Sequence, residues 1–305
     1  MENVRNNHGT IHQKIDYYTN IFLHPDTRSN AADAWKEKLH AILNGISDKT
    51  DQLKPLIQFL VAAISPAKIY MLKQPEGEIN QLVPYIDLLI VMSGKSGVPF
   101  PEMEPILNIA CAQHPQVICS LHNEGSVIEG LRAGHIFYSL YCTADNLVYD
   151  DKVMEYPAAI PETVSAIRQK ANEIFNRYFQ KAQDFYNCAT MLRQDGSSSL
   201  IMFMLHQSVE CIYRGNLQSF TGYDKKTHEI RVLMKHVRHH TSQLNIAFAD
   251  SMPENKRLIQ LLDKAYIDAR YENQYSIEEK DQKMIFDKVT LLHTVAKDVV
   301  KAVLG

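Results

Sequence analysis

The segment from residue 225 to residue 240 gathers the side chains best suited to binding phosphate. Five lysines and arginines and four histidines occur there against one acid, Glu229; they are Lys225, Lys226, His228, Arg231, Lys235, His236, Arg238, His239 and His240. A basic stripe of this kind can contact the phosphates of a nucleotide or a nucleic acid. The same composition is typical of a solvated helix face that binds nothing, so both explanations stay open.

A second group of polar residues precedes this stripe. His206 and Gln207 are followed by Glu210, one helical turn after His206, so this carboxylate could hold the imidazole. A buried His-Gln pair is as often a packing element with satisfied hydrogen bonds as a ligand contact. The group therefore predicts a hydrogen-bonded cluster, with or without a ligand.

These residues need elements to position them, and the second half of the chain has the pattern of a helical bundle. Apolar residues from Ile167 to Leu192 recur at intervals of three or four, which predicts one long helix. Further helices are expected at about 199–217, 227–238, 253–269 and 278–303. Five helices with short links predict a bundle over residues 160–305.

The first half alternates short strands with helices. Strands are expected in KIYMLK, YIDLLIVM, QVICSLHN and LVYDD, helices in DQLKPLIQFLVAAI and PEMEPILNIACAQ, and an amphipathic stretch in GSVIEGLRAGHIFYSLY. Residues 1–46 are expected to form helices that pack on this part, and Pro157 and Pro161 mark its end. The predicted fold class is α+β with two domains: a small mixed-sheet α/β domain at 47–155, then the all-α five-helix bundle.

The strand, glycine-containing loop and Asp-bearing strand of the first half resemble the core of the minimal nucleotidyltransferases of the polymerase-beta-like superfamily. That family places a Gly-Ser pair at the triphosphate and two Asp at the magnesium ions, because carboxylates one residue apart share one side of a strand. Here Lys73 and Gln74 replace the Gly-Ser pair. Tyr85 replaces the first Asp, Asp87 remains, and the later strand QVICSLHN lacks the third carboxylate. The resemblance thus implies an inactive nucleotidyltransferase-like domain, whose Asp87 is left to accept hydrogen bonds.

Residues 162–303 resemble the HEPN family of small helical domains, which often occur with minimal nucleotidyltransferases. The resemblance rests on four landmarks in the family's order: FQKAQDFYNCATML, FMLHQSVECIYRGNL, KKTHEIRVLMK and YIDARYENQYS. It implies a homodimer that binds RNA or a nucleotide of the ATP or GTP kind in a groove between helices. The residues implied in phosphate binding are His206, Lys225, Lys226, His228 and Arg270.

Several of these residues also have a structural explanation. His228, near a helix N-terminus, can cap that helix or bond to a neighbouring one, which is its favoured role, and Arg270 can clamp two helices. The rings of Tyr213, Phe220 and Tyr223 are candidate stacking faces for single-stranded RNA, although aromatic residues in such number are more often core.

Some HEPN proteins are metal-independent ribonucleases, in which an Arg and a His a few residues apart meet across a dimer. The His acts as acid or base, and the Arg stabilises the charge of the phosphorane. Arg231 and His236 have a suitable spacing, but they lie in the expected third helix, whereas the family's motif lies in a later one. They are the catalytic pair of the enzymatic alternative.

Composition and hydropathy indicate where the protein is located and which kinds of site it lacks. The apolar runs are too short to span a membrane and the polar N-terminus lacks the core of a secretory signal, so a cytoplasmic protein is expected. Five scattered cysteines without a Cys-x-x-Cys pair argue against a disulfide framework and a structural zinc, and no cofactor is expected. Residues 1–150 carry 11 basic against 16 acidic residues, and residues 151–305 carry 21 against 19.

The basic stripe and the HEPN resemblance together predict a protein that binds a nucleotide or RNA without turning it over. The resemblance further implies a toxin–antitoxin, defence or stress system. The ribonuclease and a protein-interaction scaffold without ligand are the alternatives.

Overall fold

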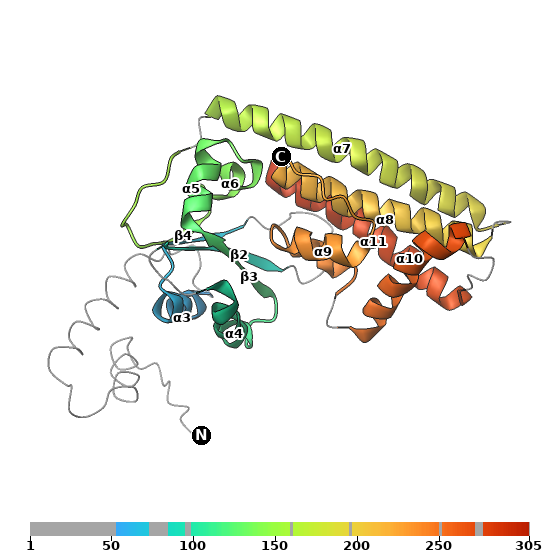
Figure 1. Ribbon diagram of the computed structural model, residues 1–305, viewed down its shortest axis with the longest axis horizontal. Coiled ribbons are helices and arrows are strands. Elements are labelled where there is room, and N and C mark those ends of the chain that lie inside the picture. Colours follow the sequence, from blue (N-terminus) through green and yellow to red (C-terminus); the bar gives the residue numbers. More distant parts are fainter. Residues whose placement is uncertain are drawn as a thin grey trace, which may run out of the picture.

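The computed structural model describes residues 53–72, 85–94, 99–158, 161–194, 197–249, 252–271 and 277–304. The helices expected in residues 1–46, and also Lys73 and Gln74, lie outside these ranges. A small sheet with short helices forms one end of the molecule, and long helices extend from it toward the other end (Figure 1). The expected α+β class, with a small mixed sheet in the first part and helices in the second, is confirmed.

The sheet has four strands in the order β3-β2-β1-β4. Strand β1 (Lys68–Met71) runs antiparallel to β2 (Ile86–Met92) and to β4 (Leu147–Asp150). Strand β3 (Val117–Asn123) runs parallel to β2. After its first residue β2 is buried throughout, as an apolar run in a strand covered on both faces should be.

Helices cover both faces of this sheet. Side chains alternate along β2, so that Leu88, Ile90 and Met92 pack in one core with α3 (Lys54–Ile64) and α4 (Phe100–Cys111). Leu89 and Val91 point the other way, toward α5 (Glu124–Arg132) and α6 (Ile136–Tyr141). The amphipathic stretch before β4 thus forms two short helices rather than one.

The core on the α5–α6 side continues into the helical part. Tyr141 of α6 contacts Phe220 of α8 edge-on, with ring centroids 6.3 Å apart, and both rings are buried. The sheet residues Leu89 and Val91 belong to the same hydrophobic cluster as the buried residues of the long helices. The two parts are therefore packed together through a common core.

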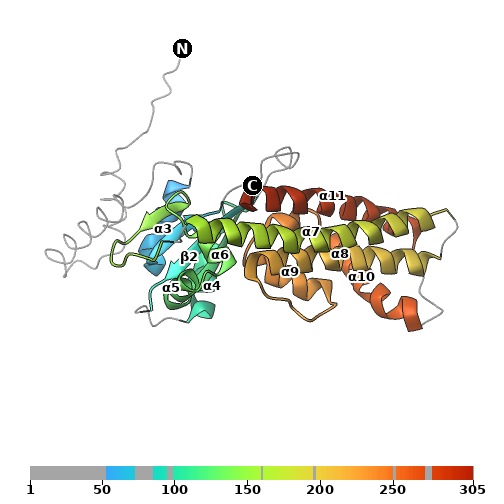
Figure 2. The same cartoon turned by 90° about the horizontal axis from the view of Figure 1, so that it is seen from above.

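Five α-helices follow in the described part of residues 161–304: α7 (Pro161–Leu192), α8 (Ser198–Thr221), α9 (Ile230–Arg238), α10 (Pro253–Tyr271) and α11 (Glu279–Leu304), with a 3-10 turn, η4, at Gln243–Ile246. Figure 2 shows α7, α8 and α11 running alongside one another. None of the described helices is both long and apolar enough to cross a membrane.

Two helix boundaries differ from those expected, and each has a local cause. Helix α8 continues to Thr221 and ends where Gly222 adopts a φ of +72°, a left-handed conformation that glycine tolerates. Helix α9 begins at Ile230 rather than at Thr227, because Asp263 of α10 accepts the Ile230 backbone N–H at 2.8 Å and so caps the helix.

Helices α7 and α8 approach each other most closely at Gly215. A Cβ atom placed on Gly215 would lie 2.6 Å from the Cβ of Tyr178 on α7, which is closer than two such atoms can come. The absence of a side chain at this position therefore sets the spacing of the two helices that form the groove described below.

The methyl group added by Gly215→Ala forces the two helices apart, which at so close a contact should cost about 2 to 3 kcal/mol. Alanine contributes roughly 1 kcal/mol through helix propensity, so the free energy of unfolding should fall by about 1 to 2 kcal/mol. Urea unfolding of the purified variant measures the difference. Gly94→Ala, where nothing lies within 4 Å of the new Cβ atom, is the matched control and should be nearly neutral. A variant as stable as the natural protein would show that the helices do not depend on this contact.

Candidate functional site

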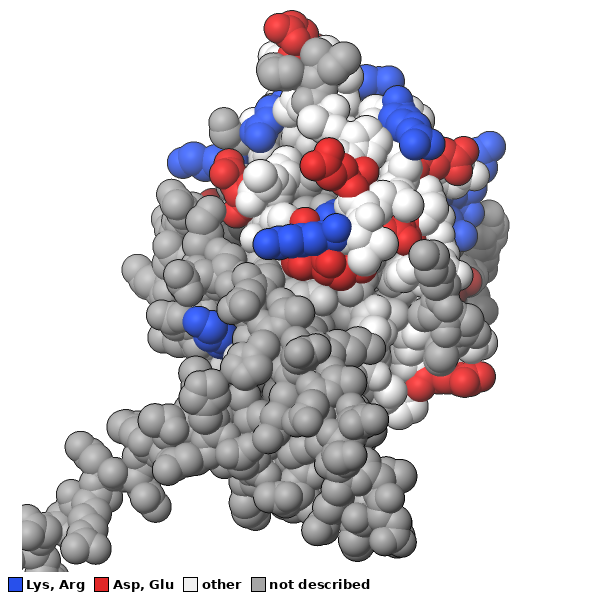
Figure 3. Space-filling view, turned by 90° about the vertical axis from the view of Figure 1, so that its left-hand side faces the viewer, with Lys and Arg blue, Asp and Glu red and all other residues white. Residues whose placement is uncertain are grey.

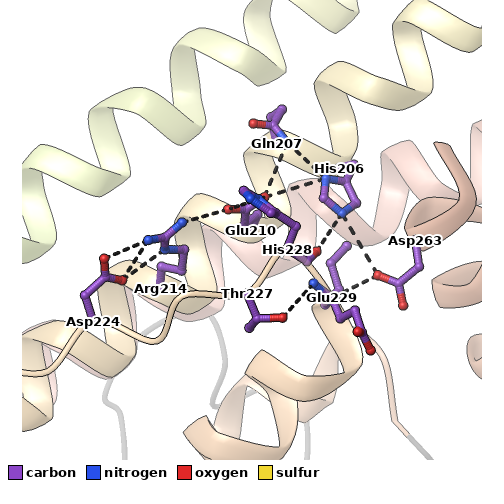
Figure 4. Close-up of polar contacts among 10 residues, drawn as sticks. His206, Gln207, Glu210, Arg214, Asp224, Thr227, His228, Glu229 and Asp263 are labelled. Atoms are coloured by element: carbon purple, nitrogen blue, oxygen red, sulfur yellow. Dashed lines mark hydrogen bonds and ion pairs between the residues drawn. The ribbon is translucent and has the colours of Figure 1, made fainter. Parts of the chain in front are cut away.

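A network of polar side chains lies in the helical part, where α8, the loop before α9 and α10 meet (Figure 4). The fully buried imidazole of His206 is at its centre. His206 Nε2 donates to the backbone carbonyl of His228 at 3.0 Å, and the Gln207 side-chain amide donates to His206 Nδ1 at 3.1 Å. These two bonds use the neutral imidazole with its proton on Nε2. His206 therefore fixes the position of the loop at His228.

Glu210 is the second centre of the network. Its side chain is 6% exposed, and both carboxylate oxygens lie 3.1 Å from His228 Nδ1. Arg214, one turn further along α8, donates to Glu210 Oε1 at 3.0 Å. The Gln207 amide donates to Glu210 Oε2 at 3.3 Å. Hydrogen bonds from a cation and from polar donors compensate the burial of this carboxylate.

Arg214 connects this network to the start of the loop. Its guanidinium donates two hydrogen bonds to Asp224 Oδ1 and one to Asp224 Oδ2, at distances from 2.7 to 3.1 Å. These bonds, together with the carboxylate of Glu210, raise the pKa of Arg214 further above its ordinary value. The loop is thus held near both of its ends, at Asp224 through Arg214 and at His228 through Glu210.

His228 is the member of the network that faces solvent. Its side chain is 52% exposed, and one face of its ring stacks on Tyr266 of α10, with centroids 4.4 Å apart and planes inclined by 16°. Because Glu210 accepts the proton of Nδ1, the other ring nitrogen, Nε2, points away from the carboxylate. Nε2 can then accept a hydrogen bond when the ring is neutral or donate one when it is protonated.

A groove of about 540 Å³ opens between α7 and α8 beside this imidazole. Its lining comes from α7, from α8 and from the loop before α9: Tyr178, Lys181, Asp184, Phe185, Gln207, Glu210, Cys211, Arg214 and His228. Lys181 on α7 is exposed, so the groove offers a mobile cation on one wall and an oriented imidazole on the other. Such donors suit an anionic ligand with a hydrogen-bonding group near His228.

The structure brings together some of the predicted ligand-binding residues. His206 and His228 are in contact, although His206 is buried and acts on His228 rather than on a ligand. Lys225 and Lys226 lie in the same loop as His228. Arg270 lies near the end of α10, and its side chain is outside the described part of the chain.

Arg231 and His236 are not brought together within one chain. Five residues along a helix separate two side chains by about 140° around the axis. Arg231 pairs with Asp263 at 3.3 Å, whereas the charges that lower the pKa of His236, after burial, are those of Lys225, His239 and Lys235. Tyr213 and Phe220, two of the candidate stacking faces, are buried in the core and cannot stack on RNA, whereas Tyr223 is 73% exposed.

Several members of the site escape prediction from sequence. Arg214 lies four residues after Glu210, a spacing that could have indicated an ion pair. Asp224 lies in the same loop as His228, but nothing in the sequence indicates that it pairs with Arg214 of α8. Lys181, Asp263 and Tyr266 come from other helices, and no local spacing connects them with His228.

Asp87 of β2, in the α/β part, is buried against the helical part. It accepts the backbone N–H of Ser242 at 3.0 and 3.1 Å and the Thr241 hydroxyl at 3.5 Å. The neighbouring Tyr85 donates its backbone N–H to the Gln243 side chain at 3.1 Å, and the Gln243 amide donates back to the Tyr85 carbonyl. The Asp87 carboxylate and the Tyr85 backbone thus both hold the segment after α9.

Burial raises the pKa of Asp87 to about 6, against the opposing effect of its hydrogen bonds from Ser242, Gln243 and Thr241. Two nearby histidines are also desolvated: burial lowers the pKa of His122 to about 4 and that of His240 to about 3. Both histidine rings pack on Phe137, with centroids 5.7 and 4.6 Å from it. At pH 7 the contact between the two parts therefore contains neutral histidines and an ionised Asp87.

A family model of the HEPN domain matches part of the chain. It matches residues 175–299. This HEPN region covers less than half of the chain, and it contains His206, Glu210, His228 and every residue of the groove. The match confirms the resemblance of the helical part, whereas the nucleotidyltransferase-like identity of residues 47–155 stays a prediction. No curated protein matches the chain. Within the described ranges, no group of three or more His, Cys, Asp or Glu residues could hold a metal ion.

The raised pKa of Asp87 gives a pH test of the contact between the two parts. Asp87 ionises near pH 6 in the folded protein but near 3.8 in the unfolded chain, so its charge progressively destabilises the fold as the pH rises through this window. Asp87→Asn removes that charge. Relative to the natural protein, the free energy of unfolding of this variant should therefore rise by about 2 kcal/mol between pH 4.5 and pH 7.5.

Urea unfolding at the two pH values measures this change, and the histidines cancel because both proteins contain them. Asp145→Asn, at an exposed aspartate, is the control and should give the same stability difference at both pH values. A pH-independent difference for Asp87→Asn would contradict the burial of its charge.

Proposed function

We propose that the HEPN region binds a nucleotide or single-stranded RNA through its phosphates, in the groove between α7 and α8, and releases it unchanged. The observation that carries this proposal is the orientation of His228. Glu210 holds Nδ1 of this ring and Tyr266 supports one of its faces, so Nε2 is presented at the groove in a fixed direction. A preoriented side chain loses little conformational entropy on binding.

The cations around His228 support a phosphate as the group that is recognised. Lys181 lines the opposite wall, and Lys225 and Lys226 precede His228 in the loop. Charge-assisted hydrogen bonds to phosphate oxygens are stronger than neutral ones. At the end of the molecule seen in Figure 3, the Lys and Arg side chains of the described residues are intermixed with Asp and Glu.

Binding without turnover fits a regulatory component of a toxin–antitoxin, defence or stress system, as the HEPN resemblance implies. The same resemblance implies a homodimer, and sedimentation of the protein with and without ligand measures that state directly. In this proposal the α/β part is a degenerate nucleotidyltransferase-like domain that supports the helical part through Asp87.

Thermal melting with ATP, GTP and a short RNA, each with magnesium and with EDTA, tests the proposal. A ligand that binds the folded state at about 100 times its Kd should raise the melting temperature by about 5 °C, and the rise should persist in EDTA. A shift that requires magnesium would contradict a groove that binds the ligand without a metal ion. The absence of any shift would favour the protein-interaction scaffold.

Lys181→Ala should weaken ligand binding about 10- to 100-fold, because it removes a charged hydrogen bond of about 1.5 to 3 kcal/mol. His228→Ala should weaken it about 2- to 10-fold, because it removes an oriented hydrogen bond of about 0.5 to 1.5 kcal/mol. Titration calorimetry measures the affinities. His114→Ala, in the α/β part, and Lys170→Ala, three turns away on the same side of α7, are matched controls that should bind normally. Equal losses of affinity in the controls would contradict the assignment of the groove as the binding site.

Incubating labelled RNA with the protein in EDTA tests the ribonuclease alternative against binding without turnover. The proposal expects intact RNA. Cleavage that is lost in His236→Ala would establish the alternative and assign Arg231 and His236 as its catalytic pair.

A further inference from the structure

Two cysteine thiols meet at the edge of the sheet, far from the groove. Cys111 is the last residue of α4, and Cys119 is the third residue of the edge strand β3. Their sulfur atoms lie 3.6 Å apart. The turn between them is closed by two backbone hydrogen bonds, from His114 to the Cys111 carbonyl at 2.9 Å and from Val117 to the His114 carbonyl at 2.8 Å. The backbone therefore holds the two thiols in contact.

This separation is close to that of a bonded pair. A disulfide has a sulfur–sulfur distance of about 2.05 Å, so rotation of the two side chains has to bring the atoms only about 1.5 Å closer. Both cysteines are half-buried, so a small oxidant can reach them from one side. All five cysteines of the chain are in its described part, and no other pair of them is in contact.

The two thiols are not equivalent. The hydrogen bond from Cys119 lowers the pKa of the Cys111 thiol, and that same bond together with burial raises the pKa of the Cys119 thiol. Since the thiolate is the nucleophilic form, Cys111 is the sulfur that an oxidant meets first. Cys119 is then placed to react with the oxidised Cys111.

We propose that Cys111 and Cys119 form a reversible disulfide when hydrogen peroxide oxidises the protein. The Cys111 thiolate attacks one peroxide oxygen, the O–O bond breaks, and the products are a sulfenic acid on Cys111 and hydroxide, which takes up the proton released by Cys111. The Cys119 thiol then attacks the Cys111 sulfur, the S–O bond breaks, and water leaves with the Cys119 proton. In total, two thiols and one peroxide give one disulfide and two waters.

The bond would join α4 to β3 at a defined point of the fold. Cys119 pairs with Leu88 of β2, the residue after Asp87, and α4 packs on the face of the sheet to which Leu88 points. Cross-linking the two elements restricts the unfolded chain and fastens the helix to the edge strand. The oxidised protein should therefore melt about 5 °C higher than the reduced one.

The test treats the full-length natural protein with a small excess of hydrogen peroxide, blocks the remaining thiols with iodoacetamide and maps peptides by mass spectrometry without reduction. We expect a cross-linked peptide that joins Cys111 to Cys119, two hydrogens lost from the intact mass, and three alkylated cysteines in place of five. Dithiothreitol should restore all five. Alkylated Cys111 and Cys119, or sulfinic acid at Cys111 without the cross-linked peptide, would overturn the proposal.

Two variants separate the roles of the sulfurs without depending on the cross-link. In Cys119→Ser, a dimedone probe should trap sulfenic acid on Cys111. In Cys111→Ser, dimedone should label Cys119 at least tenfold less than it labels Cys111 in Cys119→Ser. Cys188→Ser, which removes an exposed cysteine elsewhere, is the matched control and should form the disulfide as the natural protein does. Equal labelling of Cys111 and Cys119 would contradict the assignment of Cys111 as the nucleophile.

Discussion

The buried carboxylate of Glu210 is the constraint on which the arrangement of the helical site depends. Removing an ion from water costs several kcal/mol unless donors surround it. Helix α8 supplies two of these donors, Gln207 and Arg214, at positions that face Glu210 along the helix. The third, His228, has to come from the loop before α9. The requirement to compensate one charge thus holds that loop against α8, and the edge of the groove is defined as a consequence.

A second buried carboxylate, that of Asp87, holds the two parts of the chain together in a similar way. Asp87 of β2 accepts the backbone N–H of Ser242, and this bond joins the central strand to the segment after α9. Its hydrogen bonds offset burial only in part, since the pKa of the carboxyl is still raised to about 6. An aspartate with its oxygens turned toward backbone donors is a structural link between the strand and that segment.

Local patterns predicted most elements, because burial on one or both faces is recorded in the spacing of apolar residues. The stripe from Ile167 to Leu192 became part of α7, and the apolar run in β2 became the central strand. The start of α9 could not be found in this way, because its cap, Asp263, lies on α10. The same limit applies to the site: Glu210 and Arg214 are neighbours on one helix, but Tyr266 reaches His228 only through the tertiary fold. Tyr213 and Phe220 pack in the core, as aromatic residues in such number more often do, because α8 is buried on most of its sides.

Helix α9 links the two buried carboxylate centres. At its N-terminus, Asp263 accepts the Ile230 backbone N–H. Two residues earlier, the His228 side chain is hydrogen-bonded to Glu210 and the His228 carbonyl to His206. Just beyond its C-terminus, Thr241 and Ser242 are bound by Asp87. Between these points the apolar side of the helix is buried, so the helix is a rigid element with both ends fixed. The basic residues of α9 therefore have a fixed position relative to the groove at one end of the helix and relative to the sheet at the other. This explains why a short, strongly cationic helix is stable in the molecule although its charges repel one another: the fixed ends and the buried side hold it, and its exposed side is left to carry the charge.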